Sequence, residues 1–270
     1  MKDVYKVLEN FASDALIDKD EYIKMYNESI NDSEGFWKKH AKRINWIKNF
    51  SKVKDISFDK TDLYIKWFED GTLNVSANCI DRHLKNNSDK VALLWQGDNI
   101  EEVKKITYSE LHKEVCLMSN VLLKHNVKKG DRVATLAWNG FRHLELYFAI
   151  SGIGAICHTI NPRLSSEQMT YVVNHAEDKL IFLDLTFIPI IEAHLDKFPS
   201  STKYVLMADK EHMPECKIPN VICYEDLIEK ESSDFEWPEF DENTASGLCY
   251  TSGTTGNPKG CLLYTSPSPR

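Results

Sequence analysis

The residues best suited to chemistry lie together near the end of the sequence, between positions 250 and 260. This segment contains four Ser or Thr residues, three glycines and one lysine, and it follows small and apolar residues typical of a buried strand at 244–250. Glycines let successive backbone N–H groups point inward, hydroxyls add donors, and a lysine adds positive charge, so such a loop suits phosphate oxygens. The pattern therefore predicts a polyphosphate ligand for the segment that contains Thr251, Ser252, Gly253, Thr254, Thr255, Gly256 and Lys259.

The predicted loop is not a Walker A motif, in which the lysine directly follows the second glycine. Here Asn257 and Pro258 separate Gly256 from Lys259. A flexible Gly/Ser/Thr turn is the alternative interpretation, although such a turn requires no particular order of residues. Lys259 is as well placed to face solvent as to contact a phosphate, because its long side chain reaches water easily.

Other catalytic patterns are missing from the sequence. No H-E-x-x-H segment indicates a metal site, and no G-x-S-x-G segment indicates a serine nucleophile. His158 and Arg163 flank Asn161 and Pro162 after a predicted strand, where α/β proteins place ligand groups, so both are candidates for lining a pocket. The histidines on predicted helices are interpreted as structural, and they are His83, His112, His125, His143 and His175.

Composition narrows the class of protein. The 270 residues include 33 Lys and Arg against 41 Asp and Glu, a net charge of −8, which disfavours nucleic acid as a partner. No apolar run is long enough to span a membrane, and the first residues do not resemble a secretory signal. The seven scattered cysteines favour free thiols in a reducing compartment. We therefore expect a cytoplasmic protein.

The elements that must position the loop follow an alternating pattern from about residue 78. A long amphipathic helix is predicted, with Thr107 or Ser109 as its N-cap. Its apolar stripe consists of Leu111, Val115, Met118, Leu122 and Leu123. Strands alternating with helices imply parallel pairing, so we expect an α/β fold with a mainly parallel sheet covered by helices. The predicted strands are 91–95, 105–108, 132–137, 155–159, 179–184 and 203–208, and further helices are predicted at 142–153, 165–175 and 187–195.

The first 77 residues differ from the rest, because they are rich in Lys, Asp and Asn with aromatic residues spread through them. Tyr22, Met25 and Tyr26 recur at helical spacing, and Asp32 or Ser33 offers an N-cap for a following helix. We expect a short helical extension that packs against the larger domain without a sheet of its own. A partner-binding arm is the alternative interpretation.

The segment 250–260 resembles the signature of the AMP-forming acyl-CoA synthetases, within the adenylate-forming superfamily. This resemblance implies that the complete enzyme uses ATP, Mg²⁺ and CoA to convert a carboxylic acid to an acyl-adenylate and then to an acyl-CoA. It also implies that Thr251 to Gly256 contact the β- and γ-phosphates of ATP, with Lys259 as an auxiliary cation. An inactive nucleotide-binding fragment is the alternative function.

Two subfamilies contribute to the resemblance. Residues 22–103, including 67–75 and 79–84, are similar to the N-terminal region of acetyl-CoA synthetases, which favours acetate as substrate. From about Ala134 onward the sequence resembles medium-chain fatty-acyl-CoA ligases, notably in 136–140, 142–145 and 158–164, and the change falls near the shared segment 129–133. We expect the chain to be a hybrid of the two subfamilies, of natural or artefactual origin. The sequence does not determine the length of the acyl chain or the oligomeric state.

The resemblance also divides the chain. Residues 1–77 correspond to the N-terminal extension, 78–260 to part of the AMP-binding domain, and 261–270 to a tail that looks like translated cloning-adaptor sequence. The later family residues that bind Mg²⁺ and ribose, and the lysine of the C-terminal lid, have no counterpart here. The sequence therefore predicts a fragment without activity of its own.

Overall fold

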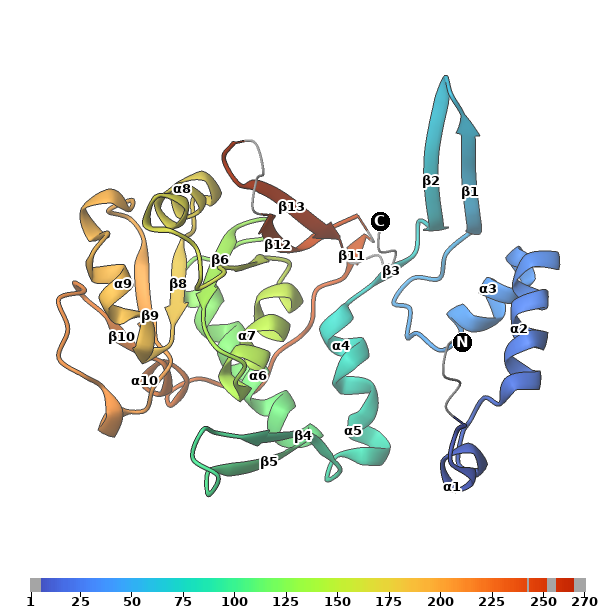
Figure 1. Ribbon diagram of the computed structural model, residues 1–270, viewed down its shortest axis with the longest axis horizontal. Coiled ribbons are helices and arrows are strands. Elements are labelled where there is room, and N and C mark those ends of the chain that lie inside the picture. The colour runs from blue at the N-terminus through green and yellow to red at the C-terminus, as the bar shows by residue number, and fades with distance from the viewer. Residues whose placement is uncertain (1–5, 242, 252–255, 265–270) are drawn as a thin grey trace. The chain divides into compact units, whose positions relative to one another are not determined.

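The computed structural model describes residues 6–241, 243–251 and 256–264. The chain divides into two compact units, of which the first ends at Gly71 and the second begins at Thr72. The first unit contains short helices and one hairpin, and the second contains the large sheet (Figure 1). The predicted phosphate loop belongs to the second unit.

The N-terminal unit begins with three helices, of which the second and third are capped by aspartates. Asp18 accepts a hydrogen bond from the N–H of Glu21, and Asp32 accepts one from the N–H of Gly35. Of the two caps that the sequence offers near residue 32, Asp32 is the one used. The helices are α1 (Glu9–Ser13), α2 (Lys19–Asn31) and α3 (Ser33–Ala41).

The same unit contains an antiparallel hairpin, so the prediction of an extension without a sheet of its own is wrong. In the hairpin, β1 (Lys52–Asp59) pairs with β2 (Asp62–Glu69). The Asp59 carboxylate accepts hydrogen bonds from the N–H and the hydroxyl of Thr61, which stabilises the tight turn between the strands. Phe58 lies in β1, and Tyr64, Trp67 and Phe68 lie in β2, rather than in further helices.

The second unit is built on a seven-stranded sheet with the strand order β10-β9-β8-β6-β7-β12-β13. Every neighbouring pair is parallel except β12 and β13, which are antiparallel. The predicted α/β fold with a mainly parallel, helix-covered sheet is confirmed. The strands are β6 (Arg132–Leu136), β7 (Ile156–Thr159), β8 (Leu180–Leu183), β9 (Lys203–Leu206), β10 (Ile222–Cys223), β12 (Ala245–Thr251) and β13 (Lys259–Tyr264).

Helices cover both faces of this sheet. One apolar cluster joins the sheet to α6 (Tyr108–Lys124), α7 (Phe141–Gly152) and α10 (Tyr224–Ile228), and a second joins the opposite face to α8 (Ser166–Ala176) and α9 (Ile188–Glu192). Short 3₁₀ turns η1 (Leu185–Phe187), η2 (Leu195–Lys197) and η3 (Lys210–His212) link these elements. The chain thus crosses the sheet from one face to the other between β7 and β8.

Of the two N-caps predicted for α6, Thr107 and Ser109, the structure uses Thr107. The hydroxyl of Thr107 accepts a hydrogen bond from the N–H of Glu110, and the Glu110 carboxylate accepts one from the N–H of Thr107. This reciprocal capping box satisfies two N–H groups that the first helical turn would otherwise leave unpaired.

Smaller elements lie outside the main sheet. The predicted strands at 91–95 and 105–108 form a separate hairpin of β4 (Val91–Gln96) and β5 (Val103–Thr107). The pairing of β3 (Thr72–Leu73) with β11 (Phe240–Asp241) makes a two-stranded sheet, and α4 (Val75–Cys79) and α5 (Asp81–Asn87) precede β4.

The strand before the loop is less buried than predicted. Within β12 only Leu248 is fully buried, and this strand lies next to the edge strand β13. The prediction of a buried strand at 244–250 is wrong in this respect.

Other surface properties follow from the described residues. None of the helices in the described ranges is long and apolar enough to cross a membrane.

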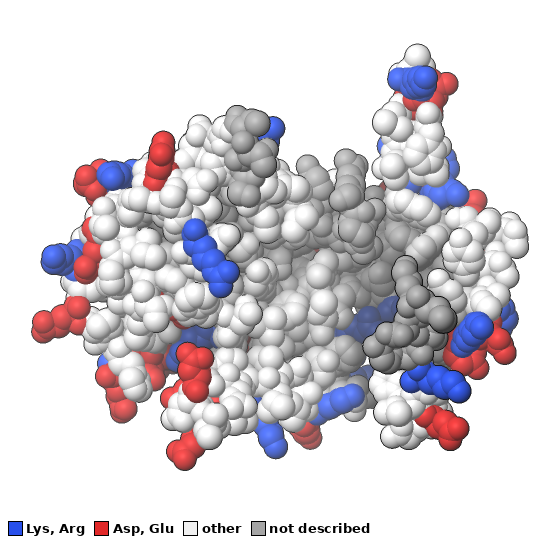
Figure 2. All heavy atoms as spheres, in the orientation of Figure 1, with Lys and Arg blue, Asp and Glu red and all other residues white. Residues whose placement is uncertain are grey.

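All seven cysteines are free in the structure. Figure 2 shows basic and acidic side chains interspersed over the face in view.

Candidate functional site

The predicted phosphate loop connects the last two strands of the sheet. β12 runs parallel to β7 and ends at Thr251, and β13 returns antiparallel with Lys259 opposite Thr251. The hydroxyl of Thr251 donates to the carbonyl of Lys259 over 3.4 Å. The loop therefore begins at the carboxyl edge of the parallel strands, where ligands of open α/β sheets bind.

The residues predicted to contact phosphate lie partly outside the described residues. Four of the predicted residues lie outside the described ranges, namely Ser252, Gly253, Thr254 and Thr255. Of the remainder, Thr251, Gly256 and Lys259 are all exposed at the two ends of the loop. The Lys259 side chain is thus accessible to solvent or to a ligand.

Tyr250 anchors the start of the loop to α8. Its hydroxyl lies 2.6 Å from Nδ1 of His175, and its ring lies 5.1 Å from the ring of His158 between centroids. Burial, followed by the nearby Asp178 carboxylate, raises the pKa of Tyr250 to about 12, so the hydroxyl stays protonated and can donate this hydrogen bond. A side-chain hydrogen bond thus ties the last residue before Thr251 to a helix.

Gly260, opposite Tyr250 on β13, leaves room for this arrangement. A Cβ at Gly260 would lie 3.3 Å from Cζ of Tyr250 and 3.2 Å from a methyl group of Leu248. These are tighter than ordinary van der Waals contacts, so a larger residue at this position would displace the tyrosine ring.

His158 has a structural position rather than the predicted one in a pocket. The side chain is fully buried, and its Nδ1 lies 2.8 Å from Oδ2 of Asp178. Burial raises the pKa of Asp178, while the hydrogen bond from His158 opposes that change. Arg163 is exposed in the loop after β7, where its backbone N–H donates to Asn161. The structure therefore does not bring His158 and Arg163 together around one cavity.

Two of the helical histidines illustrate the predicted structural role. His143 is buried, with Nε2 2.9 Å from the hydroxyl of Thr135. His112 pairs with Asp81 over 3.3 Å, and this hydrogen bond is the largest cause that raises the pKa of His112 to about 10. Among the described residues no group of three or more His, Cys, Asp or Glu side chains is arranged to hold a metal ion.

Sequence reasoning missed two features of the second unit. One is Glu145 on α7, which is buried and accepts a hydrogen bond from the hydroxyl of Tyr224 at 2.7 Å. The other is a cavity of about 590 Å³ at the carboxyl ends of β6, β8 and β9. Neither has a local sequence signal, because residues far apart in the sequence form both.

Family models match nearly the whole chain. Residues 80–266 match the model described as AMP-binding enzyme, and residues 22–79 match the model described as acetyl-coenzyme A synthetase N-terminus. The two matches meet at Cys79 and Ile80, close to where the sequence pattern changes.

Individual relatives give the same result. The chain is 38% identical to an acetyl-coenzyme A synthetase of Shewanella baltica (strain OS195), over 97% of this chain and 42% of that protein. It is 36% identical to the enzyme of the same description from Shewanella pealeana, with the same coverage. It is 50% identical to a medium-chain-fatty-acid–CoA ligase of Ectopseudomonas oleovorans, over 62% of this chain and 30% of that protein.

These matches confirm both resemblances read from the sequence. The chain spans about two fifths of the length of the acetyl-coenzyme A synthetases that it matches. The family model covers the whole parallel sheet and the loop that follows β12. The chain therefore belongs to the AMP-binding enzyme family.

Proposed function

We propose that the complete enzyme containing this chain activates a short- or medium-chain carboxylic acid with ATP. A carboxylate oxygen of the acid attacks the α-phosphorus, the bond to the β-phosphate oxygen breaks, and pyrophosphate leaves an acyl-adenylate. The sulfur of CoA then attacks the acyl carbon, its proton is lost to solvent, and AMP leaves. The position of the 250–260 loop at the carboxyl edge of a parallel sheet is the observation that carries this proposal.

In this proposal the loop holds the leaving group. Backbone N–H groups and hydroxyls of Thr251, Ser252, Gly253, Thr254, Thr255 and Gly256 donate to the β- and γ-phosphates, and Lys259 adds positive charge. Charge develops on pyrophosphate as the bond breaks, so donors fixed at that place lower the barrier. Mg²⁺ bound to the phosphates would neutralise part of the same charge.

The anchoring of Tyr250 supports this role. A loop rich in glycine is costly to order, and a hydrogen bond at its first residue reduces the conformations that the free loop can adopt. The 2.6 Å contact between Tyr250 and His175 and the pairing of Thr251 with Lys259 fix both ends of the loop on the sheet.

The substrate assignment rests on the two similarities. Likeness of residues 22–79 to the acetyl-coenzyme A synthetase N-terminus favours acetate, and the ligase relative favours a longer acid. We assign residues 1–77 to the N-terminal extension, 78–260 to part of the adenylation domain, and 261–270 to a non-native tail. We place the enzyme in the cytoplasm, where ATP and CoA are supplied.

The chain alone is proposed to bind nucleotide without turnover. Adenylation also requires an in-line carboxylate and a cation on the α-phosphate, which are positional and electrostatic requirements beyond the leaving-group site. The chain spans only 42% of the synthetases that it matches. We expect the remaining groups to come from the part of those enzymes that this chain does not match.

An assay of AMP release tests the proposal. The complete enzyme and the 270-residue chain are each incubated with ATP, Mg²⁺ and CoA, once with acetate and once with octanoate. The complete enzyme is expected to release AMP with at least one acid, and the chain alone is expected to match a control without enzyme. No acid-dependent AMP from the complete enzyme would contradict the proposed reaction, and turnover by the chain would contradict the proposed inactivity.

A further inference from the structure

The cavity of about 590 Å³ lies where the connections of the main sheet diverge. The segment after β6 leads into α7 on one face of the sheet, whereas the segment after β8, its neighbour, leads to α9 on the other face. Such a divergence leaves a crevice outside the carboxyl ends of the two strands, and open α/β proteins use that crevice for ligands. The cavity occupies this place.

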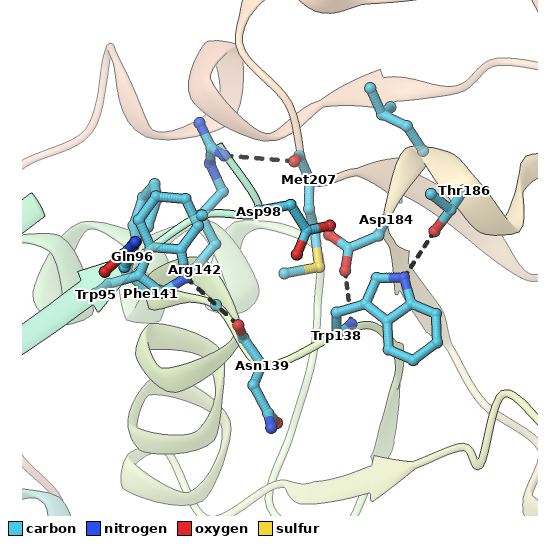
Figure 3. Close-up of a pocket in the computed structure, with 13 residues that line it drawn as sticks. Trp95, Gln96, Asp98, Trp138, Asn139, Phe141, Arg142, Asp184, Thr186 and Met207 are labelled. Atoms are coloured by element: carbon cyan, nitrogen blue, oxygen red, sulfur yellow. Dashed lines mark hydrogen bonds between the residues drawn. The ribbon is translucent and has the colours of Figure 1, made fainter. Parts of the chain in front are cut away.

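The walls of the cavity come from four separate segments. Trp138 and Asn139 follow β6, Asp184 and Thr186 follow β8, and Met207 follows β9. The hairpin of β4 and β5 closes a further side with residues 95–98. Figure 3 shows Asp98 and Asp184 in the middle of this space, with Trp95 and Phe141 on one side and Trp138 on the other.

Hydrogen bonds fix the two indole rings of the cavity. Nε1 of Trp138 donates to the hydroxyl of Thr186 at 2.9 Å, and Nε1 of Trp95 donates to the carbonyl of Asn139 at 3.4 Å. Trp138 stays about half exposed, at 51%, so part of its ring is open to the cavity. The cavity therefore offers preformed aromatic surface to a ligand.

The basic side chain of the cavity is already neutralised. Nε of Arg142 donates to the Glu225 carboxylate at 2.8 Å, and another guanidinium nitrogen reaches the carbonyl of Met207. Lys104 lies over the ring of Phe141 and belongs to the neighbouring groove. Neither cation is directed to a ligand in this space.

The two acidic side chains of the cavity, Asp98 and Asp184, have no ion-pair partner among the described residues. Asp184 accepts the N–H of Trp138 at 2.6 Å. Burial raises the pKa of Asp184, while this hydrogen bond and the electrostatic influence of His143 and Arg142 oppose that change. Because Arg142 is ion-paired with Glu225, the two carboxylates leave the cavity with net negative charge.

An anion is the competing occupant, because α7 begins at the cavity and its N-cap, Gly140, provides no side-chain cap. However, the Asp184 carboxylate already supplies negative charge to the loop that precedes α7. A second anion would face both aspartates at short range in a partly desolvated space, which is unfavourable. The charge of the cavity thus opposes phosphates and carboxylates, including the acid substrate of the proposed reaction.

We propose that this cavity is a second ligand site, for a small organic cation that carries an ammonium group on an apolar body. The ammonium group lies against Asp184 and Asp98, and the apolar body contacts the indoles of Trp138 and Trp95. Indole rings are the aromatic surfaces that attract cations most strongly, and carboxylates accept the N–H donors. This site does not depend on the phosphate loop or on the proposed reaction.

Three matched probes test the charge preference. The 270-residue chain is titrated with 2-phenylethylammonium, with the neutral 2-phenylethanol and with the anionic 3-phenylpropanoate, while NMR follows the indole N–H signals of Trp95 and Trp138. We expect saturable binding of the ammonium compound, at least about tenfold tighter than either other probe, because one charge-assisted hydrogen bond is worth that much. Equal or tighter binding of 2-phenylethanol or of 3-phenylpropanoate, or no saturation by the ammonium compound, would overturn the proposal.

Single substitutions locate the site. Asp184→Asn keeps an oxygen that accepts the N–H of Trp138 and removes the charge, so the fold is expected to persist while ammonium affinity falls by about tenfold. Asp98→Asn is expected to weaken binding in the same direction, and Asp89→Asn, an exposed aspartate outside the cavity, is the control. Unchanged affinity in both cavity variants would show that the ammonium group binds elsewhere.

Discussion

The hydroxyl of Tyr250 lies 2.6 Å from Nδ1 of His175, and this contact joins the residue before the phosphate loop to the last turn of α8. The two residues are 75 positions apart in the sequence. β12 lies next to the edge strand and is only partly buried, and this hydrogen bond holds its last residues against α8. The orientation of the loop therefore depends on a helix that does not adjoin it in sequence.

Removing this hydrogen bond should loosen the base of the loop. We expect Tyr250→Phe to lower the free energy of unfolding by about 1 kcal/mol and to speed amide hydrogen exchange in β13, because the ring stays but the donor is lost. Exchange measured by mass spectrometry over residues 256–264 checks this expectation. Tyr204→Phe is a matched control, since Tyr204 is buried and forms no side-chain hydrogen bond among the described residues. Equal exchange rates in wild type and Tyr250→Phe would mean that the contact does not hold the strand.

Glu145 should make stability depend on pH. Burial raises its pKa to about 8, above the ordinary value of 4.5 expected in the unfolded chain, so the folded state binds a proton more tightly. The free energy of unfolding should therefore fall as pH rises from about 4.5 to about 8, where both states have lost the proton. Glu145→Gln keeps an acceptor for Tyr224 and should stabilise the protein more at pH 8.5 than at pH 5.

Urea unfolding of Glu145→Gln and wild type at both pH values checks this dependence. Glu101→Gln, at an exposed turn residue, serves as the control and should show no such difference. A stability gain of Glu145→Gln that is the same at pH 5 and pH 8.5 would show that Glu145 does not titrate in this range.

The capping box of α6 should contribute to stability through the helix start. Thr107→Ala removes the acceptor for the N–H of Glu110, and we expect the free energy of unfolding to fall by about 1 kcal/mol. Thr107→Ser keeps the cap and should recover most of this loss, which urea unfolding of both variants would measure. Equal destabilisation by Ser and Ala would indicate a role for the threonine methyl group instead.

The alternation of strands and helices was predictable because each buried element has a simple period. The strands around 132–137, 155–159, 179–184 and 203–208 are short apolar runs, and the intervening helices carry apolar stripes. Strands that are buried on both faces of a parallel sheet are apolar throughout. This pattern can be read within each segment, without knowledge of its tertiary contacts.

Other elements of the fold depend on tertiary contacts and have no pattern in the local sequence. The partly exposed strands β1 and β2 lack a strong apolar period, so their hairpin was missed. β13 was missed because its pairing with β12 is set by tertiary structure. The loop motif identifies phosphate chemistry from residue order alone, whereas the burial of His158 against Asp178 and the joining of Trp138 to Asp184 require the fold.

The most direct test of the proposed function is acid-dependent exchange of pyrophosphate into ATP by the complete enzyme, because this exchange requires the loop to hold the leaving group. Thr254→Val with Thr255→Val removes two hydroxyl donors, and we predict a loss of roughly tenfold or more in kcat/KM for MgATP. Thr244→Val, which precedes β12, should leave the exchange unchanged. Wild-type exchange kinetics in the double variant would contradict the account and leave the loop as a structural turn.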